Sequence, residues 1–364
     1  MVWWFLCHVW TYWSLINHLF ILSEIVPQSA IEWFETILEQ LFFHAMSYYI
    51  YQSDSFLLST RMFMYFQVCI HLWKMNSFFK ANRDYREIYL SRKTGREIGF
   101  SPFSEQREIR YPGNITLREF GTYMVYPTLT YQDHYPVSEV SVKNGSWVKK
   151  VIARFIIVLM GLFVAYELAQ HLLVPLVCQF THLKIDHALE SFTAWYVPCL
   201  TLYYSLFLII FDHILNLYGE ISGFQDRQQY QDYWNATTFE EYARKWNRPV
   251  HEYLHRHWYL EVLGKWGKEV TIFQAQLATF LYSVYFHEIY LAVMFKEVSF
   301  YLTSLQIYQL LLFFIMARLK GTMLGNVIQW LGMFFCITNV LYLYNYDLAN
   351  FTYSKGGGCM NLYK

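Results

Sequence analysis

Long apolar segments alternate with short polar ones along most of the chain. A helix of about twenty mostly apolar residues is long enough to cross a bilayer, so this pattern is typical of a polytopic membrane protein. We expect seven clear spans, at residues 1–22, 55–73, 147–177, 191–218, 269–295, 299–317 and 322–346. The pattern therefore predicts an all-α transmembrane bundle, and we expect residues 1–364 to form a single membrane-embedded domain.

Two further segments are less regular. Residues 31–51 carry Glu32, Glu35 and Glu39 among aromatic side chains, which is typical of an amphipathic helix in the membrane interface. Residues 111–136 contain three prolines, which interrupt regular secondary structure, so we expect broken and partly embedded segments there. If both segments cross the membrane, the number of spans rises to eight or nine.

The basic residues of the loops predict an orientation. Residues 74–110 hold nine Lys or Arg against five Asp or Glu, and such a loop is expected on the cytoplasmic side. Seven spans then place the N-terminus in the cytoplasm and the C-terminus in the lumen. The first apolar segment lacks a basic start and a small-residue cleavage site, so we expect it to be retained as a span. The long polar stretch at residues 219–268 is also expected on the cytoplasmic side.

Composition agrees with a membrane protein. Hydrophobic residues make up 55% and aromatic residues 21% of the chain, whereas charged residues make up 15%, against about 25% in a typical soluble domain. The net charge is zero, with 28 basic and 28 acidic residues, which argues against nucleic acid as a partner. The six cysteines are scattered without a CxxC pair, and they predict neither a disulfide framework nor a metal cluster.

Two ionisable residues lie side by side within one predicted span. His287 and Glu288 interrupt the apolar segment at residues 279–295. A charge at the bilayer centre costs about 2.5–3.5 kcal/mol on insertion scales, and such groups normally face a protein interior or a wet cavity. A neutral imidazole there could act as a general base. The alternative is a buried structural histidine bonded to a backbone carbonyl.

A second polar group lies in the long polar stretch. The segment Y-Q-D-Y-W-N occupies residues 230–235, and W-N-R-P-V-H occupies residues 246–251. Helical spacing would place Arg244, Asn247 and His251 on one face, where a cation, an amide and an imidazole suit a polar ligand from the cytoplasm. The alternative is an amphipathic helix whose polar face meets lipid headgroups.

Residues 251–255 read H-E-x-x-H, which is the pattern of zinc proteases. In that motif, two histidines on one helical face hold Zn²⁺ and the glutamate activates water. No third ligand stands in a recognisable setting, so an intramembrane zinc protease is left as an alternative. A non-enzymatic lipid transporter, with His287 as a polar lining, is a second alternative.

The order of several motifs resembles the sterol and diacylglycerol acyltransferase branch of the membrane-bound O-acyltransferases. The F-Y-x-D-W-W-N signature of that branch is similar to residues 229–235, and its W-N-x-P-V-H is similar to residues 246–251. Its S-x-x-x-H-E, which holds the catalytic histidine, is similar to residues 283–288. Upstream, P-T-L at residues 127–129 and Y-P at residues 135–136 also match, so the ordered motifs extend over most of the chain.

The chain departs from the family pattern in several places. Gln229 stands where the signature has Phe, and Tyr233 stands where it has its first Trp. An upstream M-K-x-H-S-F segment resembles residues 74–78, with Asn in place of His. Residues 293–301 and 325–332 resemble fungal-type sterol O-acyltransferases, and we expect these two segments to line the acceptor side of the cavity. Ordinary packing between spans is the alternative account of them.

The resemblance implies a helical bundle with an intramembrane reaction chamber, in the endoplasmic reticulum membrane. It implies transfer of a long acyl chain from acyl-CoA to a sterol hydroxyl, with diacylglycerol as the alternative acceptor. His287 would be the general base and Asn247 would donate to the oxyanion, without a covalent acyl-enzyme. Neither a cofactor nor a metal is implied, because acyl-CoA is a substrate.

The resemblance also implies a set of further site residues and a homodimer. Residues matching the acyl-CoA side are Tyr230, Asp232, Trp234, Asn235, Arg244, His251, Tyr259 and Ser283, with Glu288 and Trp246 in supporting positions. Relatives use a lysine on this side, and Lys268 is the nearest candidate for it.

Overall fold

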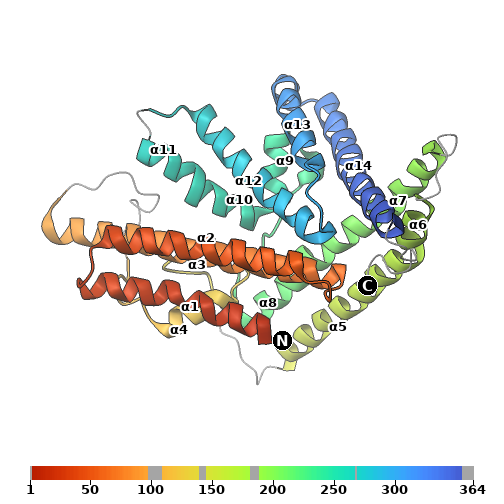
Figure 1. The fold of residues 1–364 in the computed structure, drawn as a ribbon. Coiled ribbons are helices and arrows are strands. Elements are labelled where there is room, and N and C mark those ends of the chain that lie inside the picture. Colours follow the sequence, from red (N-terminus) through yellow and green to blue (C-terminus); the bar gives the residue numbers. More distant parts are fainter. Residues whose placement is uncertain (1, 97–108, 139–144, 181–187, 267–268, 355–364) are drawn as a thin grey trace. The chain divides into compact units, whose positions relative to one another are not determined.

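The computed structural model describes residues 2–96, 109–138, 145–180, 188–266 and 269–354 (Figure 1). Within these ranges the chain forms helices and no β-strand, so the all-α prediction is confirmed. The helices are α1 (Val2–Ser23), α2 (Gln28–Gln52), α3 (Leu58–Thr94), α4 (Leu117–Val125), α5 (Gly145–Leu168), α6 (Val174–Phe180), α7 (Ala188–Leu208), α8 (Leu215–Ser222), α9 (Phe239–Trp246), α10 (Arg248–Leu254), α11 (Leu260–Trp266), α12 (Ile272–Phe295), α13 (Tyr301–Ala317) and α14 (Met323–Ser354).

Among the described residues, three pairs of helices are continuous through π-helical turns. These turns lie at Ala169–Leu173 between α5 and α6, at Ile209–Ile214 between α7 and α8, and at His255–Tyr259 between α10 and α11. A π turn inserts one residue into a helix and shifts the direction of the side chains that follow it. The predicted spans at 147–177 and 191–218 are therefore each one long helix with such an insertion.

Five helices of the described residues are long and apolar enough to cross a membrane, by length and composition. They are Trp3–Ser23, Gly145–Val177, Ala194–Ser222, Ile272–Phe295 and Met323–Leu348. Each coincides with a predicted span, and the shorter apolar helix α13 coincides with a sixth. The seventh predicted span, residues 55–73, is instead the first part of α3. Residues 31–51, expected in the interface, lie within α2, which is not among the five.

The prediction of a loop over residues 74–110 is wrong for its first half, because α3 continues to Thr94. Buried Phe78, Tyr85 and Ile88 lie among the charged residues of this segment. Their spacing gives the helix an apolar face that packs inward. The basic side chains beside them are paired: buried Lys74 donates to three backbone carbonyls at residues 123–126, and Lys80 and Arg83 form ion pairs with Glu261. Residues 97–108 lie outside the described residues.

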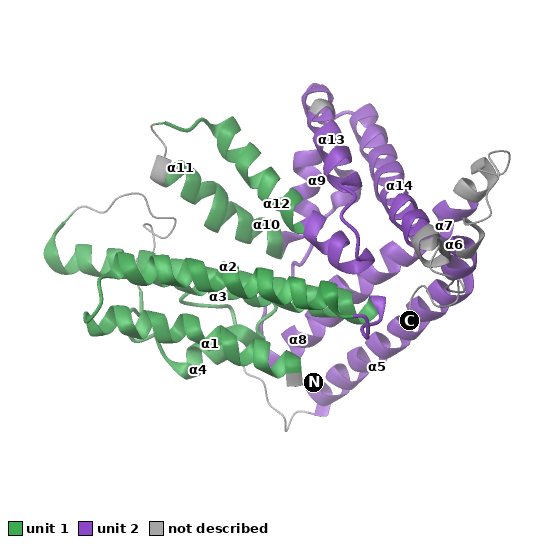
Figure 2. Ribbon diagram, viewed as in Figure 1, with its two compact units in different colours: residues 1–53, 59–137, 249–286 green, residues 54–58, 138–248, 287–364 purple. Residues whose placement is uncertain are grey.

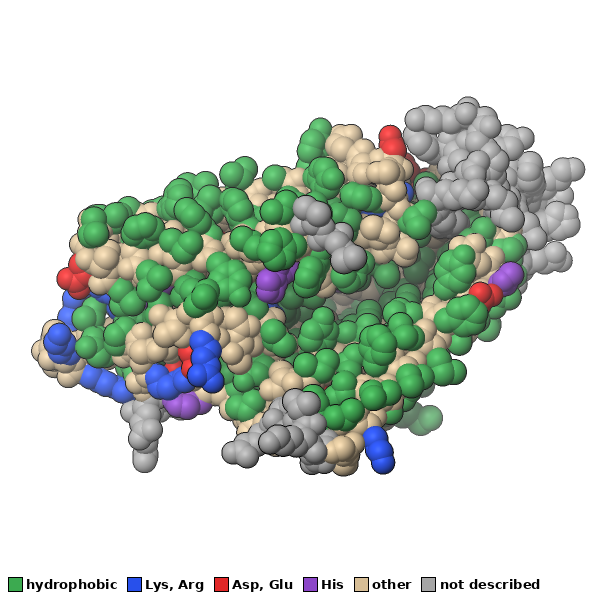
Figure 3. Space-filling view, turned by 90° about the horizontal axis from the view of Figure 1, so that it is seen from below, with side chains coloured by type: hydrophobic (Ala, Val, Ile, Leu, Met, Phe, Trp, Pro, Cys, Tyr) green, Lys and Arg blue, Asp and Glu red, His purple; other side chains and the backbone are tan. Residues whose placement is uncertain are grey.

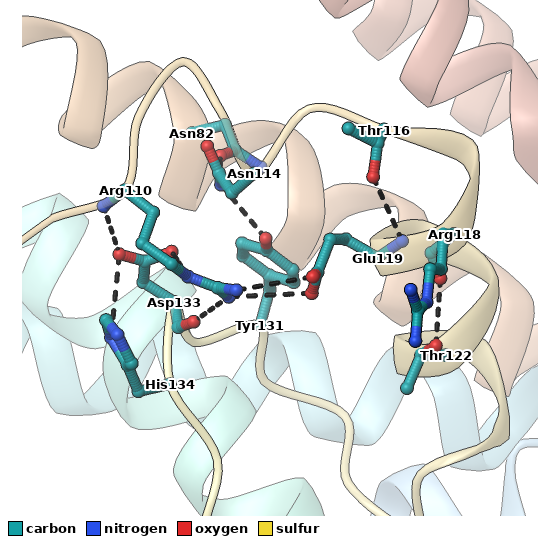
Figure 4. A network of polar contacts seen from close by, with 10 residues as sticks. All are labelled: Asn82, Arg110, Asn114, Thr116, Arg118, Glu119, Thr122, Tyr131, Asp133 and His134. Carbon is teal, nitrogen blue, oxygen red and sulfur yellow. Dashed lines mark hydrogen bonds and ion pairs between the residues drawn. The ribbon is translucent and has the colours of Figure 1, made fainter.

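The prediction of broken structure over residues 111–136 is confirmed, since α4 is the one helix described there. Arg110 bonds Asp133 and pairs with Glu119, which ties the two ends of the segment together (Figure 4). The amide of Asn114 donates to the Tyr131 hydroxyl at 2.9 Å. These contacts hold an irregular segment in one place, which regular backbone bonding cannot do here.

The chain divides into two compact units (Figure 2). One unit contains residues 1–53, 59–137 and 249–286, and the other contains residues 54–58, 138–248 and 287–364. Helix α12 contributes to both, because the division falls between Phe286 and His287. The expectation of one membrane-embedded domain stays a prediction.

The core of the first unit is aromatic and that of the second joins distant helices. In the first, Phe78, Phe120 and Tyr131 pack together and are buried. In the second, the indole of Trp195 on α7 donates to the Thr338 carbonyl of α14 at 3.1 Å. In a bilayer environment every buried polar group needs a partner inside the protein, as Trp195 and Thr338 provide for each other here.

Apolar side chains also cover much of the surface. Figure 3 shows hydrophobic side chains over most of the face that it draws, with charged side chains sparse. On α5, Met160 is 64% exposed and Phe163 is 61% exposed. Contiguous apolar surface of this extent marks a membrane-facing or partner-facing region, which agrees with the predicted spans.

Candidate functional site

Helix α12 carries the two ionisable residues that the sequence singled out. His287 and Glu288 lie in its second half, inside the candidate span Ile272–Phe295. The His287 side chain is exposed, whereas Glu288 is 8% exposed and points into the packed interior of its unit. Adjacent residues on a helix project about 100° apart, so Glu288 can be anchored in the interior while the neighbouring His287 side chain is exposed.

The Glu288 carboxylate is held by four donors from two other helices. At the start of α13, it accepts the backbone N–H groups of Phe300 and Thr303, both at 3.1 Å, and the Thr303 hydroxyl at 2.7 Å. The hydroxyl of Tyr344 on α14 donates to it at 2.8 Å. These contacts support a structural role for Glu288, in which it holds the neighbouring helices.

The residue before α13 explains why that helix needs an external cap. Phe300 stands at the N-cap position with φ 56°, in the left-handed region, and its side chain has no oxygen to accept a bond. The first N–H groups of a helix have no partner within it and favour a negative charge. The Glu288 carboxylate on α12 supplies both the hydrogen-bond acceptor and the negative charge. It thereby fixes the position of the adjacent His287 relative to the start of α13.

The signature loop, by which we mean residues 229–237, is joined to α9 by backbone hydrogen bonds and by an ion pair. The N–H of Gln231 donates to the Lys245 carbonyl at 2.8 Å. The Lys245 ammonium lies 3.0 Å from Asp232 and 2.8 Å from Glu241. Hydrogen bonding to Lys245 lowers the pKa of both carboxyls, that of Glu241 to about 2, and raises the pKa of Lys245 itself. The loop and α9 are therefore one electrostatically joined element at neutral pH.

The predicted shared face of Arg244, Asn247 and His251 is wrong. Helix α9 ends at Trp246, Asn247 leaves the helix with φ −137° and ψ 83°, and α10 begins at Arg248. The cause is Pro249, which has no N–H to donate to the Lys245 carbonyl and whose ring would clash with it in a continuous helix. That carbonyl accepts Gln231 instead, so the proline both breaks the helix and frees the attachment point of the signature loop.

Trp246 anchors the end of α9 in an aromatic cluster. Its ring stacks on Phe207 at 4.0 Å and on Tyr203 at 5.6 Å, both from α7, and it meets Tyr233 edge-on at 4.7 Å. Offset and edge-to-face aromatic pairs add about 0.5–1.5 kcal/mol each beyond area burial. Asn247, the next residue, is thus held at a defined point between two helices.

The remaining predicted residues divide between the two units. The unit containing His287 also contains Glu288, Asn247, Trp246, Arg244, Tyr230, Asp232, Trp234 and Asn235. The other unit contains His251, Tyr259 and Ser283. Lys268 lies outside the described residues.

The three rings of His251, His255 and Tyr259 form a ladder along one side of α10 and the π turn after it. The two histidine rings lie 6.0 Å apart, and His255 lies 5.4 Å from Tyr259, with both pairs stacked. In the described part of the chain, no three His, Cys, Asp or Glu side chains form a group that could hold a metal ion. The two histidines of the H-E-x-x-H segment thus stack on each other, and His255 also stacks on Tyr259.

Residues 293–301 and 325–332 were expected to line the acceptor side. In the structure, four of their side chains instead pack against Tyr344 or bond to the signature loop. Phe295 is buried and stacks on Tyr344 at 5.2 Å, and Tyr301 meets the same ring at 5.4 Å. Asn326 and Trp330 bond to the signature loop rather than to a cavity wall. These contacts favour the alternative account, in which the residues pack within the protein. The sequence gave no signal of the bonds from Asn326 and Trp330, because the loop lies more than ninety residues earlier in the chain.

Comparison with known proteins identifies related sequences. The profile of the MBOAT, or membrane-bound O-acyltransferase, family matches residues 43–345. Diacylglycerol O-acyltransferase 1C of Glycine max is 33% identical over 78% of this chain and 54% of its own length. Diacylglycerol O-acyltransferase 1 of Corylus americana is 32% identical over 83% of this chain and 55% of its own.

A yeast sterol enzyme is similar over a shorter region. Sterol O-acyltransferase 2 of Saccharomyces cerevisiae is 31% identical over 65% of this chain and 38% of its own length. The chain spans about half the length of the diacylglycerol relatives that it matches.

Proposed function

Because the chain belongs to the membrane-bound O-acyltransferase family, we propose that it transfers an acyl group from acyl-CoA to the hydroxyl of a neutral lipid. The observation that carries the proposal is the setting of His287. This histidine is exposed within a candidate membrane span, and its neighbour Glu288 is fixed by four hydrogen bonds. A base on an anchored helix can be held at one distance from a reacting hydroxyl.

The proposed reaction needs one proton acceptor and no cofactor. An imidazole nitrogen of His287 takes the proton from the lipid hydroxyl as the hydroxyl oxygen bonds to the thioester carbonyl carbon. The tetrahedral intermediate then collapses, the carbon–sulfur bond breaks, and the departing thiolate takes the proton from the imidazolium. The products are an ester and free CoA, and the histidine is neutral again.

Asn247 is the proposed donor to the oxyanion of that intermediate. It stands in the break between α9 and α10, and Trp246 and the signature loop fix that position. A preorganised donor of this kind supplies about 2.7–4 kcal/mol of transition-state stabilisation. The signature-loop residues Tyr230, Asp232, Trp234 and Asn235, together with Arg244, His251, Tyr259 and Ser283, are proposed to contact acyl-CoA.

For the acceptor, we place diacylglycerol first and a sterol second. The sequence favoured a sterol through residues 293–301 and 325–332. Phe295, Tyr301, Asn326 and Trp330 have packing partners that account for those residues without an acceptor. The diacylglycerol relatives also match more of the chain, 78% and 83%, than the yeast sterol enzyme, at 65%.

The cellular setting is proposed on the same family basis. We place the protein in the endoplasmic reticulum membrane with a cytoplasmic N-terminus. An opening of the site towards the cytoplasm suits acyl-CoA, which is polar. A homodimer is likewise a proposal, and it rests on the resemblance alone.

The test is acyl transfer by the purified protein. It is incubated with radiolabelled oleoyl-CoA and dioleoylglycerol, cholesterol or ergosterol, or a long-chain alcohol, and the labelled ester is measured. We expect an ester from the wild type and a loss of at least a hundredfold in His287→Ala. The matched control is His171→Ala, which removes a histidine from another candidate span, where it pairs with Glu167. Absence of ester with every acceptor, or full turnover in His287→Ala, would contradict the proposal.

A further inference from the structure

The start of α14 is bonded directly to the signature loop. The side-chain amide of Asn326 donates to the carbonyl oxygens of Trp234 at 2.8 Å and Ala236 at 2.9 Å. One turn later on α14, the indole N–H of Trp330 donates to the same Trp234 carbonyl at 3.0 Å. Two side chains of one helix thus supply donors to the carbonyls of Trp234 and Ala236, in a segment ninety or more residues earlier in the chain.

A glycine makes this close approach possible. A Cβ on Gly325 would lie 2.6 Å from the Leu319 carbonyl oxygen and 2.8 Å from that of Thr237, distances that atoms do not tolerate. The N–H of Gly321 donates to the Thr237 hydroxyl at 2.9 Å in the same place. The turn before α14 and the first turn of α14 therefore rest against residues 234–237 without space for a side chain between them.

The contacts of Asn326 and Trp330 matter because the backbone N–H groups of the loop donate to other carbonyls, those of Arg227, Gln231, Asp232, Tyr233 and Lys245. Residues 233–235 form a single 3₁₀ turn, after which the chain is extended until Thr238 caps α9. A carbonyl without a partner in such a segment costs about 1–3 kcal/mol when buried, and Ala236 is completely buried. The side-chain amide of Asn326 thus supplies a partner to each of the carbonyls of Trp234 and Ala236 and helps to fix the segment against α14.

The same segment is connected to Asn247. From Trp234, the chain runs back two residues to Asp232, whose carboxylate pairs with Lys245 at 3.0 Å. Lys245 lies two residues before Asn247, and its carbonyl holds Gln231. All of these residues belong to the unit that also contains α14 and His287 (Figure 2). A shift of the loop would therefore be transmitted to Asn247 through one ion pair and one backbone bond.

Resting on the proposed function, we propose that Asn326 is a positioning residue for acyl-CoA binding, acting through the carbonyls of Trp234 and Ala236 on the signature loop. It does not contact the substrate. Its amide sets the distance between α14 and the loop, and the loop sets Asp232, Trp234 and Asn247 for the thioester side of the reaction.

The first test separates affinity for the two substrates. Asn326→Asp keeps the size of the side chain but replaces the donating amide with a carboxylate that repels both carbonyls. We expect the KM for oleoyl-CoA to rise about tenfold and the KM for the acceptor to stay within twofold. Trp330→Phe keeps the ring but removes one donor, and we expect a rise of about threefold. A purely structural role would reduce the amount of active protein and leave both KM values unchanged.

The matched control is Asn339→Ala on the same helix. Asn339 accepts a hydrogen bond from Tyr196 of α7 at 2.7 Å, so this variant weakens another attachment of α14 and spares the signature loop. We expect its KM for oleoyl-CoA to stay within twofold of the wild type. A wild-type KM for oleoyl-CoA in Asn326→Asp, or an equal rise in Asn339→Ala, would overturn the inference.

A second measurement does not depend on turnover. Hydrogen–deuterium exchange of the detergent-solubilised full chain reports the protection of backbone amides at residues 229–247. We expect Asn326→Asp to raise exchange there at least tenfold and Asn339→Ala to leave it unchanged. Unchanged exchange in Asn326→Asp would refute the positioning role even if the protein formed no ester. If the wild type formed no ester while Asn326→Asp still raised the exchange, the proposed function would be refuted and the contact between α14 and the loop would be supported.

Discussion

The carboxylate of Glu288 performs the capping that the start of α13 cannot provide from its own sequence. Phe300 occupies the N-cap position, and a phenyl ring cannot accept a hydrogen bond. By accepting bonds from Phe300 and Thr303 as well as Tyr344, Glu288 joins α12 to both α13 and α14. The residue beside the proposed base thus has a structural task.

Glu288→Ala should lower stability and Glu288→Gln should lower it less. Alanine leaves two backbone N–H groups and the Tyr344 hydroxyl without their acceptor, at a cost of about 2–4 kcal/mol. Glutamine keeps one acceptor oxygen but loses the negative charge that the helix start favours. Melting temperatures in detergent, monitored by size-exclusion chromatography after heating, measure the difference in stability. Equal melting temperatures for all three proteins would contradict the capping role.

Asn247→Ala should reduce kcat by at least tenfold with little change in the KM for acyl-CoA. The reason is that a donor to the oxyanion acts in the transition state rather than on the bound substrate. Initial rates over a range of oleoyl-CoA concentrations separate the two constants. A rise in KM at unchanged kcat would instead assign Asn247 to substrate binding.

Among the elements, α9 is bounded by an N-cap at its start and by a proline-induced break after its last residue. Thr238 caps the start of α9 by accepting the Glu241 N–H at 3.1 Å, and Glu241 in turn accepts the Thr237 N–H at 3.0 Å. Pro249 stops a continuous helix beyond Trp246. Between these points, Lys245 joins the helix to the signature loop. A short helix that would be marginal alone is therefore defined by its cap, its break and one ion pair.

The contribution of Glu241 should depend on pH with a definite sign. Its pKa falls from 4.5 to about 2 on folding, mainly through the hydrogen bond from Lys245. The stabilisation is complete above the unfolded pKa of 4.5 and is lost as the pH falls towards about 2. We expect Glu241→Gln to lower the melting temperature at pH 7 and to differ less from the wild type at pH 3. A gap that is as large at pH 3 as at pH 7 would be inconsistent with this assignment.

At the scale of the whole molecule, two units are interleaved in sequence, and α12 runs from one to the other. Residues 249–286 return to the unit that the N-terminal helices form, and residues 287–364 complete the other. The single break in unit membership along α12 falls directly before His287. The proposed base is therefore held by the unit that also holds Asn247 and the signature loop.

The acceptor is a property of the whole molecule, since it depends on which helices enclose the lipid-facing side of the site. With equimolar dioleoylglycerol and ergosterol in mixed micelles, we expect triacylglycerol to exceed steryl ester at least fivefold. The reason is that the residues that resembled sterol enzymes have packing partners of their own. Thin-layer separation of the labelled products gives the ratio. Steryl ester as the main product would reverse the assignment.

The class of the fold and the family could both be predicted from the amino-acid sequence. Runs of about twenty apolar residues fix a membrane helix because each such helix satisfies its own backbone bonds and meets lipid with its side chains. Five predicted spans coincide with helices of sufficient length and hydropathy for this reason. The ordered motifs at residues 230–235, 246–251 and 283–288 identified the branch, and the profile match of residues 43–345 confirms the family.

The contacts that hold the site residues, in contrast, arise from packing between distant parts of the chain. Glu288 bonds to Tyr344, 56 residues away, and Asn326 bonds to Trp234, 92 residues away. Periodicity and hydropathy describe which face of a helix is apolar, but they do not say which distant donor a polar group on that face will meet. The local break at Asn247 could have been read from Pro249. The partners of Glu288 and Asn326 could not, because they are set by the packing of α12 and α14 against elements remote in the chain.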